Sequence, residues 1–271
     1  MDYLQAILIA VVEGLTEYLP VSSTAHMIFV SSFFGNQEDD FVKLFQVSIQ
    51  FGAILAVVFL YWRKFFDFRK VTFYVKLVCA VIPALVLGKL FDDKIDAVLG
   101  NPIPIAIVLI AGGIVLLFVD GRFYSPTVVH EEDITIKKAI VIGFWQCLAM
   151  MPGTSRSAAS IIGGMQQGLT RETAAEFSFF LAVPTMLAVT TYSLFLKTYA
   201  TSQLKGYELL FQSPNNLEMF IIGNIIAFVI AAIAIKFFIG IIKKYGFKPW
   251  AYYRIVAGII LLTYFSLTTK N

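Results

Sequence analysis

Six stretches of this chain are apolar and long enough to cross a lipid bilayer as helices, and they restrict the fold more than any other feature. Each approaches the roughly 20 residues that such a helix needs, and none holds more than two charged side chains. They span residues 45–62, 73–90, 103–119, 174–196, 217–235 and 250–267. With 58% hydrophobic and 14% charged residues, the chain is too apolar for an ordinary soluble domain. The sequence predicts an all-α polytopic membrane protein with six spanning helices, folded as a single integral membrane domain over residues 1–271.

Two further apolar segments are interrupted near their middles by polar and helix-breaking residues. The first runs over 4–34 and breaks at LPVSST, residues 19–24, whereas the second runs over 139–165 and breaks at MPGTSRS, residues 151–157. The arms on either side are too short to span singly, and irregular backbone at membrane depth is tolerated only inside protein or beside a watery cavity. We therefore expect two re-entrant helical hairpins in addition to the six spanning helices.

The two interruptions resemble each other. PVSSTA (20–25) aligns with PGTSRS (152–157), which sets Ser23 opposite Ser155 and Thr24 opposite Arg156. A second similarity links IAGGIVLL (110–117) to VAGIILL (256–262). Each half then has one hairpin and three spanning helices, and because three is an odd number the second half enters from the opposite side of the membrane. This predicts an inverted-topology repeat, with one unit at 1–120 and the other at 137–271.

The distribution of Lys and Arg predicts the orientation, since cytoplasmic loops carry the excess of basic residues. One side receives fourteen of them, Arg254 included, and the other receives six, Lys270 included. The first side is therefore expected to be cytoplasmic, with both termini outside, the first hairpin entering from the outside and the second from the cytoplasm. The net charge of +3 suits a protein anchored to anionic membrane lipids and gives no indication of a nucleic-acid partner.

The first interruption brings ionisable groups and hydroxyls together. Glu13 and Glu17 are four residues apart, so they stack on one face of a helix, where like charges repel. A pair of interfacial carboxylates in contact with water would explain them, but ionisable groups inside membrane segments are usually functional. After Pro20, the hydroxyls of Ser22, Ser23 and Thr24 fall where a second half-helix begins, with His26 on its first turn. The free N–H groups and partial positive charge of a helix N-terminus predict an anion site there.

The second interruption repeats this arrangement and adds a cation. Its residues are Gly153, Thr154, Ser155, Arg156 and Ser157. An arginine deep in a membrane protein needs a carboxylate partner or an anionic ligand, and its planar fork matches a phosphate. If the two tips meet, the carboxylates opposite suit proton transfer or a divalent metal that bridges carboxylate and phosphate. These residues favour a membrane-embedded phosphatase, with an anion or phospholipid transporter on the same inverted repeat as the alternative.

At these residues the chain resembles a known family. EGLTEYLPVSSTAH (13–26) and MPGTSRSAAS (151–160) look like the two signature segments of the undecaprenyl-diphosphatase family, also called bacitracin resistance proteins. The similarity extends to FQVSIQFGAILAVV (45–58), GFWQCLA (143–149) and AAEFSFFLAVP (174–184), and thus covers nearly the whole chain. In the family pattern, glycine often replaces Ala25 and Ala158. Both differences are small and concern the backbone geometry rather than the function.

The resemblance implies an integral enzyme of the plasma (inner) membrane that hydrolyses undecaprenyl diphosphate to undecaprenyl phosphate and phosphate at the outer face. This hydrolase activity recycles the lipid carrier for peptidoglycan synthesis, and it confers bacitracin resistance because the carrier without its terminal phosphate no longer binds the antibiotic. The resemblance also implies a divalent cation, Mg²⁺ or Ca²⁺. The glutamate pair of the family corresponds to Glu13 and Glu17, its histidine to His26, and its phosphate-binding hydroxyls and arginine to Ser22, Ser23, Thr24, Ser155, Arg156 and Ser157.

For the mechanism, we expect Arg156 and the two half-helix N-termini to hold the diphosphate, with Glu17 and Glu13 positioning a metal or acting as the base. Ser23 is the first candidate for the nucleophile, with His26 as base or leaving-group acid. Attack by His26 itself, or by a metal-bound water, stays open at this point. Gln50 and Glu176 are polar positions within spanning helices that could support the site. The sequence leaves oligomeric state and lipid chain length undecided.

Overall fold

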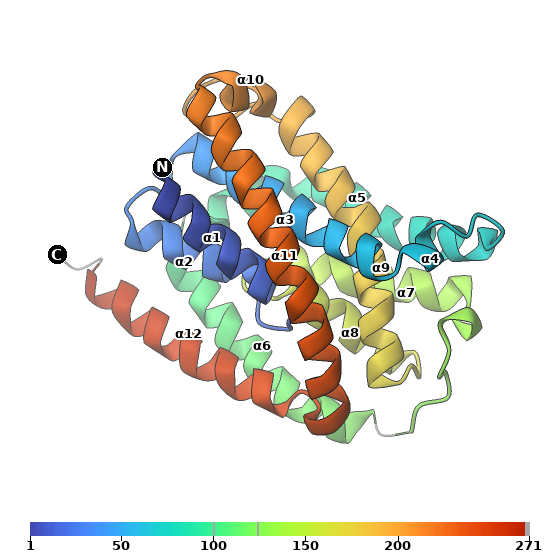
Figure 1. Ribbon diagram of the computed structural model, residues 1–271. Helices are drawn as coiled ribbons and strands as arrows, with labels where there is room; N and C mark the ends of the chain where they lie inside the picture. Colours follow the sequence, from blue (N-terminus) through green and yellow to red (C-terminus); the bar gives the residue numbers. More distant parts are fainter. Residues whose placement is uncertain (100, 124, 269–271) are drawn as a thin grey trace.

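The structure is a computed structural model that describes residues 1–99, 101–123 and 125–268. Lys270, which the prediction of orientation counts, lies outside the described residues. The helices in Figure 1 are α1 (Tyr3–Thr16), α2 (Ser23–Phe33), α3 (Asp40–Leu60), α4 (Trp62–Phe65), α5 (Val71–Leu99), α6 (Pro102–Arg122), α7 (Ile136–Gln146), α8 (Arg156–Gln166), α9 (Arg171–Thr191), α10 (Gly206–Phe211), α11 (Pro214–Tyr245) and α12 (Lys248–Thr268). Short 3₁₀ turns cover Glu131–Asp133 and Cys147–Met150, and a π-helical turn, Tyr192–Leu196, extends α9.

The prediction of an all-α fold with six long apolar helices is confirmed. Helices α3, α5, α6, α9, α11 and α12 are each long and apolar enough to cross a membrane. In the described part of the chain the only β-type pairings are the isolated bridges Val128–Leu169 and Thr198–Lys205. In Figure 1 the start of α1, the end of α12 and the short α10 lie toward one side of the bundle, and α4 lies toward the other.

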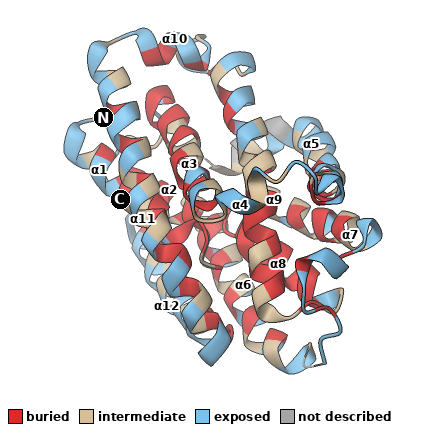
Figure 2. Ribbon diagram, turned by 45° about the vertical axis from the view of Figure 1, so that its right-hand side comes forward, coloured by how far each residue is buried: buried red, intermediate tan, exposed pale blue. Residues whose placement is uncertain are grey.

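The outer faces of the long helices carry large apolar side chains, and Figure 2 shows that buried residues concentrate inside the bundle. Phe118 on α6 and Ile233 on α11 are 69% and 63% exposed. In water, such a belt would be an aggregation surface, whereas in a bilayer it meets lipid tails of the same polarity. The fold is therefore that of a multi-pass membrane protein.

Small residues let the helices approach closely, which is how helices associate in lipid, where the hydrophobic effect between them is weak. A Cβ atom on Gly52 of α3 would lie 2.3 Å from the Asn224 carbonyl oxygen of α11. A Cβ atom on Gly143 of α7 would lie 2.1 Å from the Ala80 carbonyl oxygen of α5. Substitution at either position would force two helices apart.

Two proline-containing helices border the interior. Pro83 lies inside α5 and Pro184 inside α9, and a proline removes the backbone donor that a regular helix uses at that position. Beside Pro184, the hydroxyl of Thr185 donates to the Leu181 carbonyl oxygen at 2.7 Å. The residues that follow each proline, Ala84 and Thr185, line a cavity between the two helices.

Candidate active site

The two predicted interruptions are real breaks in helices. One lies between α1 and α2, and the other lies between α7 and α8, with the 3₁₀ turn Cys147–Met150 included in the second. We call the segment 17–22 turn one and the segment 151–155 turn two. Each ends in a serine in the left-handed backbone region that caps the following half-helix. Ser22 has φ 70° and its hydroxyl accepts from the Ala25 N–H at 3.4 Å, while Ser155 has φ 76° and accepts from the Ala158 N–H at 3.2 Å.

This shared backbone geometry corrects the predicted alignment of the turns by one residue. The sequence alignment set Ser23 opposite Ser155, but the capping serines show that Ser22 is the structural equivalent of Ser155. Ser23 is therefore equivalent to Arg156, since each is the first residue of its half-helix. The alignment was wrong because it matched Pro20 with Pro152, and Pro152 lies one residue farther from its cap than Pro20 does.

Both first residues bind the same carboxylate. The Ser23 hydroxyl donates to Glu17 Oε2 at 2.5 Å, and Arg156 Nη2 donates to Glu17 Oε1 at 2.7 Å. All three side chains are buried. Charge-assisted bonds of this kind are short and strong, and a buried pair that loses one partner is left with an uncompensated charge. The structure thus brings Glu17, Ser23 and Arg156 together from segments 139 residues apart.

Arg156 is held on its other side by α9. Its Nη1 donates to the carbonyl oxygen of Ser178 at 2.8 Å and to the Ser178 hydroxyl at 3.3 Å. The same hydroxyl pairs with that of Ser160 at 2.7 Å, and the Tyr18 ring lies 5.8 Å from the guanidinium carbon. Ser178 is not among the predicted site residues, because its only signal in the sequence is a hydroxyl within an apolar spanning run. The bonds to Ser178 fix the orientation of the Arg156 guanidinium plane toward Glu17.

Glu13 lies one helical turn before Glu17, as predicted, and is fully buried. Neither of its carboxylate oxygens has a hydrogen-bond partner among the described residues. A buried acceptor pair without donors fits a cation, and Glu13 and Glu17 are the residues that would hold one. No group of three His, Cys, Asp or Glu side chains within the described ranges could hold a metal. A divalent ion would need further oxygen ligands, such as water or phosphate, which Mg²⁺ commonly keeps.

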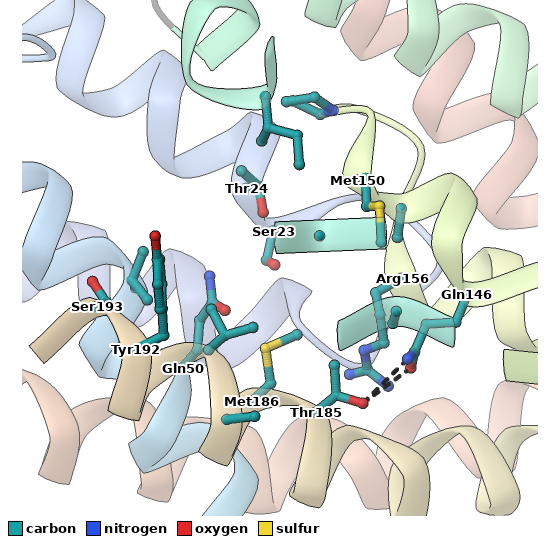
Figure 3. Close-up of a pocket in the computed structure, with 18 of the residues that line it drawn as sticks. Ser23, Thr24, Gln50, Gln146, Met150, Arg156, Thr185, Met186, Tyr192 and Ser193 are labelled. Carbon is teal, nitrogen blue, oxygen red and sulfur yellow. Dashed lines mark hydrogen bonds between the residues drawn. The ribbon is translucent and has the colours of Figure 1, made fainter. Parts of the chain in front are cut away.

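A cavity of about 450 Å³ opens beside these residues (Figure 3). Seven of the predicted site residues line it, namely Glu17, Ser22, Ser23, Thr24, Gly153, Ser155 and Arg156. Away from them the lining is largely apolar, with Leu85, Met150, Met186 and Val189. Gln50 also lines the cavity, whereas the carboxylate of Glu176 accepts from the Tyr61 hydroxyl at 3.3 Å elsewhere on α9. The arrangement suits an amphipathic ligand with an anionic head.

Comparison with known proteins identifies the family. A family profile described as "Bacitracin resistance protein BacA" matches residues 6–260. The chain belongs to the BacA family. A relative from Flavobacterium psychrophilum is 54% identical over 97% of this chain and 95% of its own length, and one from Wolinella succinogenes is 43% identical over 98% of this chain and 100% of its own. A third, from Porphyromonas gingivalis, is 47% identical over 97% of this chain and 96% of its own length. All three carry the name undecaprenyl-diphosphatase.

Four predicted site residues of this BacA-family chain do not line the cavity. Glu13 is enclosed behind Glu17, and the hydroxyl of Ser157 donates to the Leu19 carbonyl oxygen at 2.8 Å, which ties turn two to turn one. The carbonyl oxygen of Thr154 accepts from an arginine of α12. His26 has its Nδ1 2.7 Å from the Ser22 carbonyl oxygen and its Nε2 2.8 Å from the Tyr253 hydroxyl. Both ring nitrogens therefore bind groups outside the Glu17 cluster.

That arginine is Arg254, which the distribution of Lys and Arg assigns to the side predicted to be cytoplasmic. The structure corrects this assignment, because Arg254 is fully buried within α12 and its guanidinium binds backbone carbonyl oxygens of both turns. Removing it from the count still leaves a clear excess of basic residues on the side predicted to be cytoplasmic. The signal that was available is its place four residues inside the last apolar run, where an arginine needs buried partners.

Proposed function

We propose that this chain hydrolyses undecaprenyl diphosphate to undecaprenyl phosphate and inorganic phosphate, and so recycles the lipid carrier of peptidoglycan synthesis and confers bacitracin resistance. The observation that carries the proposal is the Glu17 carboxylate, which binds Ser23 and Arg156 at the meeting point of two half-helix N-termini. The name of the relatives, undecaprenyl-diphosphatase, supports the same reaction. The cluster combines a hydroxyl, a base and an anion clamp, which a phosphatase needs.

The shape and polarity of the cavity support a polyprenyl diphosphate as the substrate. The diphosphate would bind Arg156 and the ends of α2 and α8, with Ser22, Thr24, Gly153 and Ser155 around it. The first isoprene units would lie along the apolar lining formed by α5 and α9, including Leu85 and Val189. Binding of the remote chain in this way would orient the anhydride at the Glu17 cluster.

In the mechanism that this geometry favours, the Ser23 hydroxyl attacks the terminal phosphorus. Its proton passes to Glu17 Oε2 and from there to the bridging oxygen as the bond between that oxygen and the terminal phosphorus breaks, so undecaprenyl phosphate leaves with that oxygen and Glu17 becomes a carboxylate again. Water then hydrolyses the phosphoserine and releases phosphate, with Glu17 taking a proton from the water and returning it to the Ser23 oxygen. Arg156 and the half-helix N-termini stabilise the charge that develops on the phosphoryl oxygens. We prefer Ser23 to His26 as nucleophile because Ser23 lines the cavity and His26 binds Ser22 and Tyr253.

A divalent cation, Mg²⁺ or Ca²⁺, is part of the proposal, with Glu13 and Glu17 as its protein ligands. When bound, such an ion would supply charge neutralisation at the two carboxylates and attract phosphate oxygens. The partnerless carboxylate of Glu13 is the feature that supports it.

The topology is also a proposal. We take the pairs α1–α2 and α7–α8 as re-entrant hairpins and the halves 1–120 and 137–271 as inverted repeats, in the bacterial plasma membrane with the site open to the outer face. The position of the start of α1 and the end of α12 on one side of the bundle supports termini on the same side (Figure 1). A reporter fused to the C-terminus tests the orientation: activity from a periplasmic reporter is expected, and a cytoplasmic signal would contradict it.

The activity is tested by phosphate release from C55 polyprenyl diphosphate by the purified protein in detergent. We expect release by the wild type and its loss in Glu17→Ala and Arg156→Ala, with the wild type carrying phosphate on Ser23 after a quench in SDS at neutral pH, which preserves both phosphoserine and phosphohistidine. A phosphorylated His26, or a competent single turnover with no phosphorylated residue, would instead assign the attack to histidine or to water. The transporter alternative predicts movement of the lipid across vesicles without phosphate release, and that result would reject the proposal.

A further inference from the structure

Arg254 has an unusual environment for a buried cation. Within the described part of the chain, the four hydrogen bonds of its guanidinium all go to backbone carbonyl oxygens: Nε to Leu109 at 3.1 Å, Nη1 to Pro20 at 3.1 Å and Thr154 at 3.0 Å, and Nη2 to Gly153 at 2.7 Å. Burial of a charge without hydrogen-bond partners is costly, and these four bonds compensate for the burial of the Arg254 guanidinium. The Arg254 guanidinium joins α12, α6 and both turns at one point.

We propose that Arg254 is a positioning residue that fixes turn one against turn two and thereby holds Ser23 and Arg156 at the distance at which both reach Glu17. This inference rests on the proposed phosphatase function. Pro20 and Gly153, which both accept from Arg254, each lie two residues before a capping serine. A single guanidinium thus binds equivalent carbonyls of the two turns, so that movement of one turn relative to the other would break one of these bonds.

The direction of the bonds matters as well as their number. The carbonyl and the N–H of a trans peptide point in opposite directions, so a carbonyl held by Arg254 directs the following N–H away from it. For the bond between Thr154 and Ser155, the carbonyl faces Arg254 and the N–H of Ser155 faces away. Arg254 therefore keeps three carbonyl oxygens, which would repel a phosphate, turned toward itself and adds a positive charge behind the turns.

The surrounding chain is built to admit this side chain. Gly112 on α6 leaves the space that the guanidinium fills, since a Cβ atom there would lie 2.0 Å from Arg254 Nη2.

Tyr253, the residue before Arg254 on α12, also acts on turn one, through His26. In neutral His26 the nitrogen that meets the Ser22 carbonyl must be the donor, so Nε2 accepts from the Tyr253 hydroxyl. Arg254 thus binds the Pro20 carbonyl oxygen of turn one directly, and Tyr253 holds the Ser22 carbonyl oxygen of the same turn through His26.

The test uses two variants that disturb the guanidinium in different ways. Arg254→Lys keeps the positive charge but replaces the planar fork with a single ammonium, and Gly112→Ala leaves Arg254 in place while displacing its Nη2. Gly121→Ala is the matched control, because it adds the same methyl group to the same helix where nothing lies within 4 Å of the new Cβ. For each protein, kcat and KM for C55 polyprenyl diphosphate are measured in detergent, together with the thermal midpoint and the fraction recovered as a monodisperse species.

We expect kcat per folded molecule to fall about 100-fold in both variants, because a misplacement near 1 Å at reacting groups has that effect, with KM within about threefold of the wild type. Gly121→Ala should match the wild type in all measurements. The inference is overturned if kcat stays within about twofold, or if KM rises with kcat unchanged, since that pattern indicates ground-state binding alone. It is also overturned if both variants lose folded protein while the remainder keeps full kcat, because Arg254 would then be a structural residue only. Absence of phosphate release by the wild type would contradict the proposed function itself.

Discussion

Turn one and turn two have the same backbone and different chemistry. Both end in a left-handed serine cap, both present the N-terminus of a half-helix, and both have an equivalent carbonyl oxygen that accepts a hydrogen bond from Arg254. At the first position after the cap, turn one has Ser23 and turn two has Arg156, and both side chains bind Glu17. Two turns with the same backbone geometry therefore supply a hydroxyl and a cation to one carboxylate through a difference at a single equivalent position.

The charges are segregated between the two hairpins. Residues 3–33, around turn one, include Glu13 and Glu17 and no Lys or Arg, whereas residues 139–166, around turn two, include Arg156 and no Asp or Glu. Neither hairpin can neutralise its own buried charge, so each needs the other. This mutual requirement explains why a split site can be stable inside a membrane protein: the Glu17–Arg156 pair joins the hairpins as well as forming the site.

The largest expected effect tests whether the difference between Ser23 and Arg156 is chemical. Ser23→Ala removes the proposed nucleophile, and we expect phosphate release to fall by about 10³-fold or more, with no phosphoprotein in quenched reactions. Ser31→Ala is the control, since Ser31 is a buried hydroxyl on the same half-helix that bonds only to the Ile28 carbonyl oxygen in the described structure. Retention of more than a tenth of the wild-type rate by Ser23→Ala would assign the attack to another group.

The next effect tests the fork of turn two. Arg156→Lys keeps a positive charge but cannot bind Glu17 and Ser178 at once with the geometry of a guanidinium, so kcat should fall about 10²-fold. Arg171→Lys is a matched control, because Arg171 also pairs with a carboxylate, that of Asp120 at 2.7 Å, but at the periphery and partly exposed. We expect it to stay within about twofold. Equal losses in the two variants would show that the effect is general to ion pairs and not specific to the turn.

Much of this arrangement could be predicted from the sequence. The six apolar runs and the two interruptions follow from hydropathy and from Pro, Gly and hydroxyl residues, and Glu17, Ser23 and Arg156 stand out as polar groups within them. The one-residue shift in the alignment of the two turns could not be predicted from the sequence, because it depends on which serine adopts a positive φ. The prediction for Arg254 was wrong because the sequence pattern, a basic residue near one end of an apolar run, is the same whether the side chain faces lipid headgroups or backbone carbonyls in the interior. Ser178 differed from its apolar neighbours in the sequence only by its hydroxyl.

A smaller effect concerns the carboxylates of Glu13 in α1 and Glu17 in turn one, which have no counterpart in α7 or turn two. We expect a chelator to lower phosphate release and added Mg²⁺ or Ca²⁺ to restore it. Glu13→Gln should raise the metal concentration that gives half-maximal activity by about tenfold, because one anionic ligand is lost. Glu172→Gln is the control, since Glu172 lies partly exposed beside Lys243. Full activity after exhaustive chelation would contradict a metal at Glu13 and would leave its buried carboxyl with a role in proton transfer.

The smallest expected effect tests whether the two turns are equivalent in energy as well as in shape. A non-glycine residue at φ 70° or 76° is strained, and glycine at Ser22 or Ser155 would relieve that strain while losing the side-chain cap. Ser22→Gly and Ser155→Gly should therefore leave the free energy of unfolding unchanged or raise it by up to about 1 kcal/mol, whereas Ser22→Ala and Ser155→Ala should lower it by about 1 kcal/mol. Ser155 also pairs with the Ser157 hydroxyl at 3.1 Å, so the alanine variant of turn two should be the less stable of the two. The thermal midpoints of the four variants are measured in one detergent. If Ser22→Gly and Ser155→Gly changed the midpoint in opposite directions, the two turns would share a backbone shape but would be stabilised by different interactions.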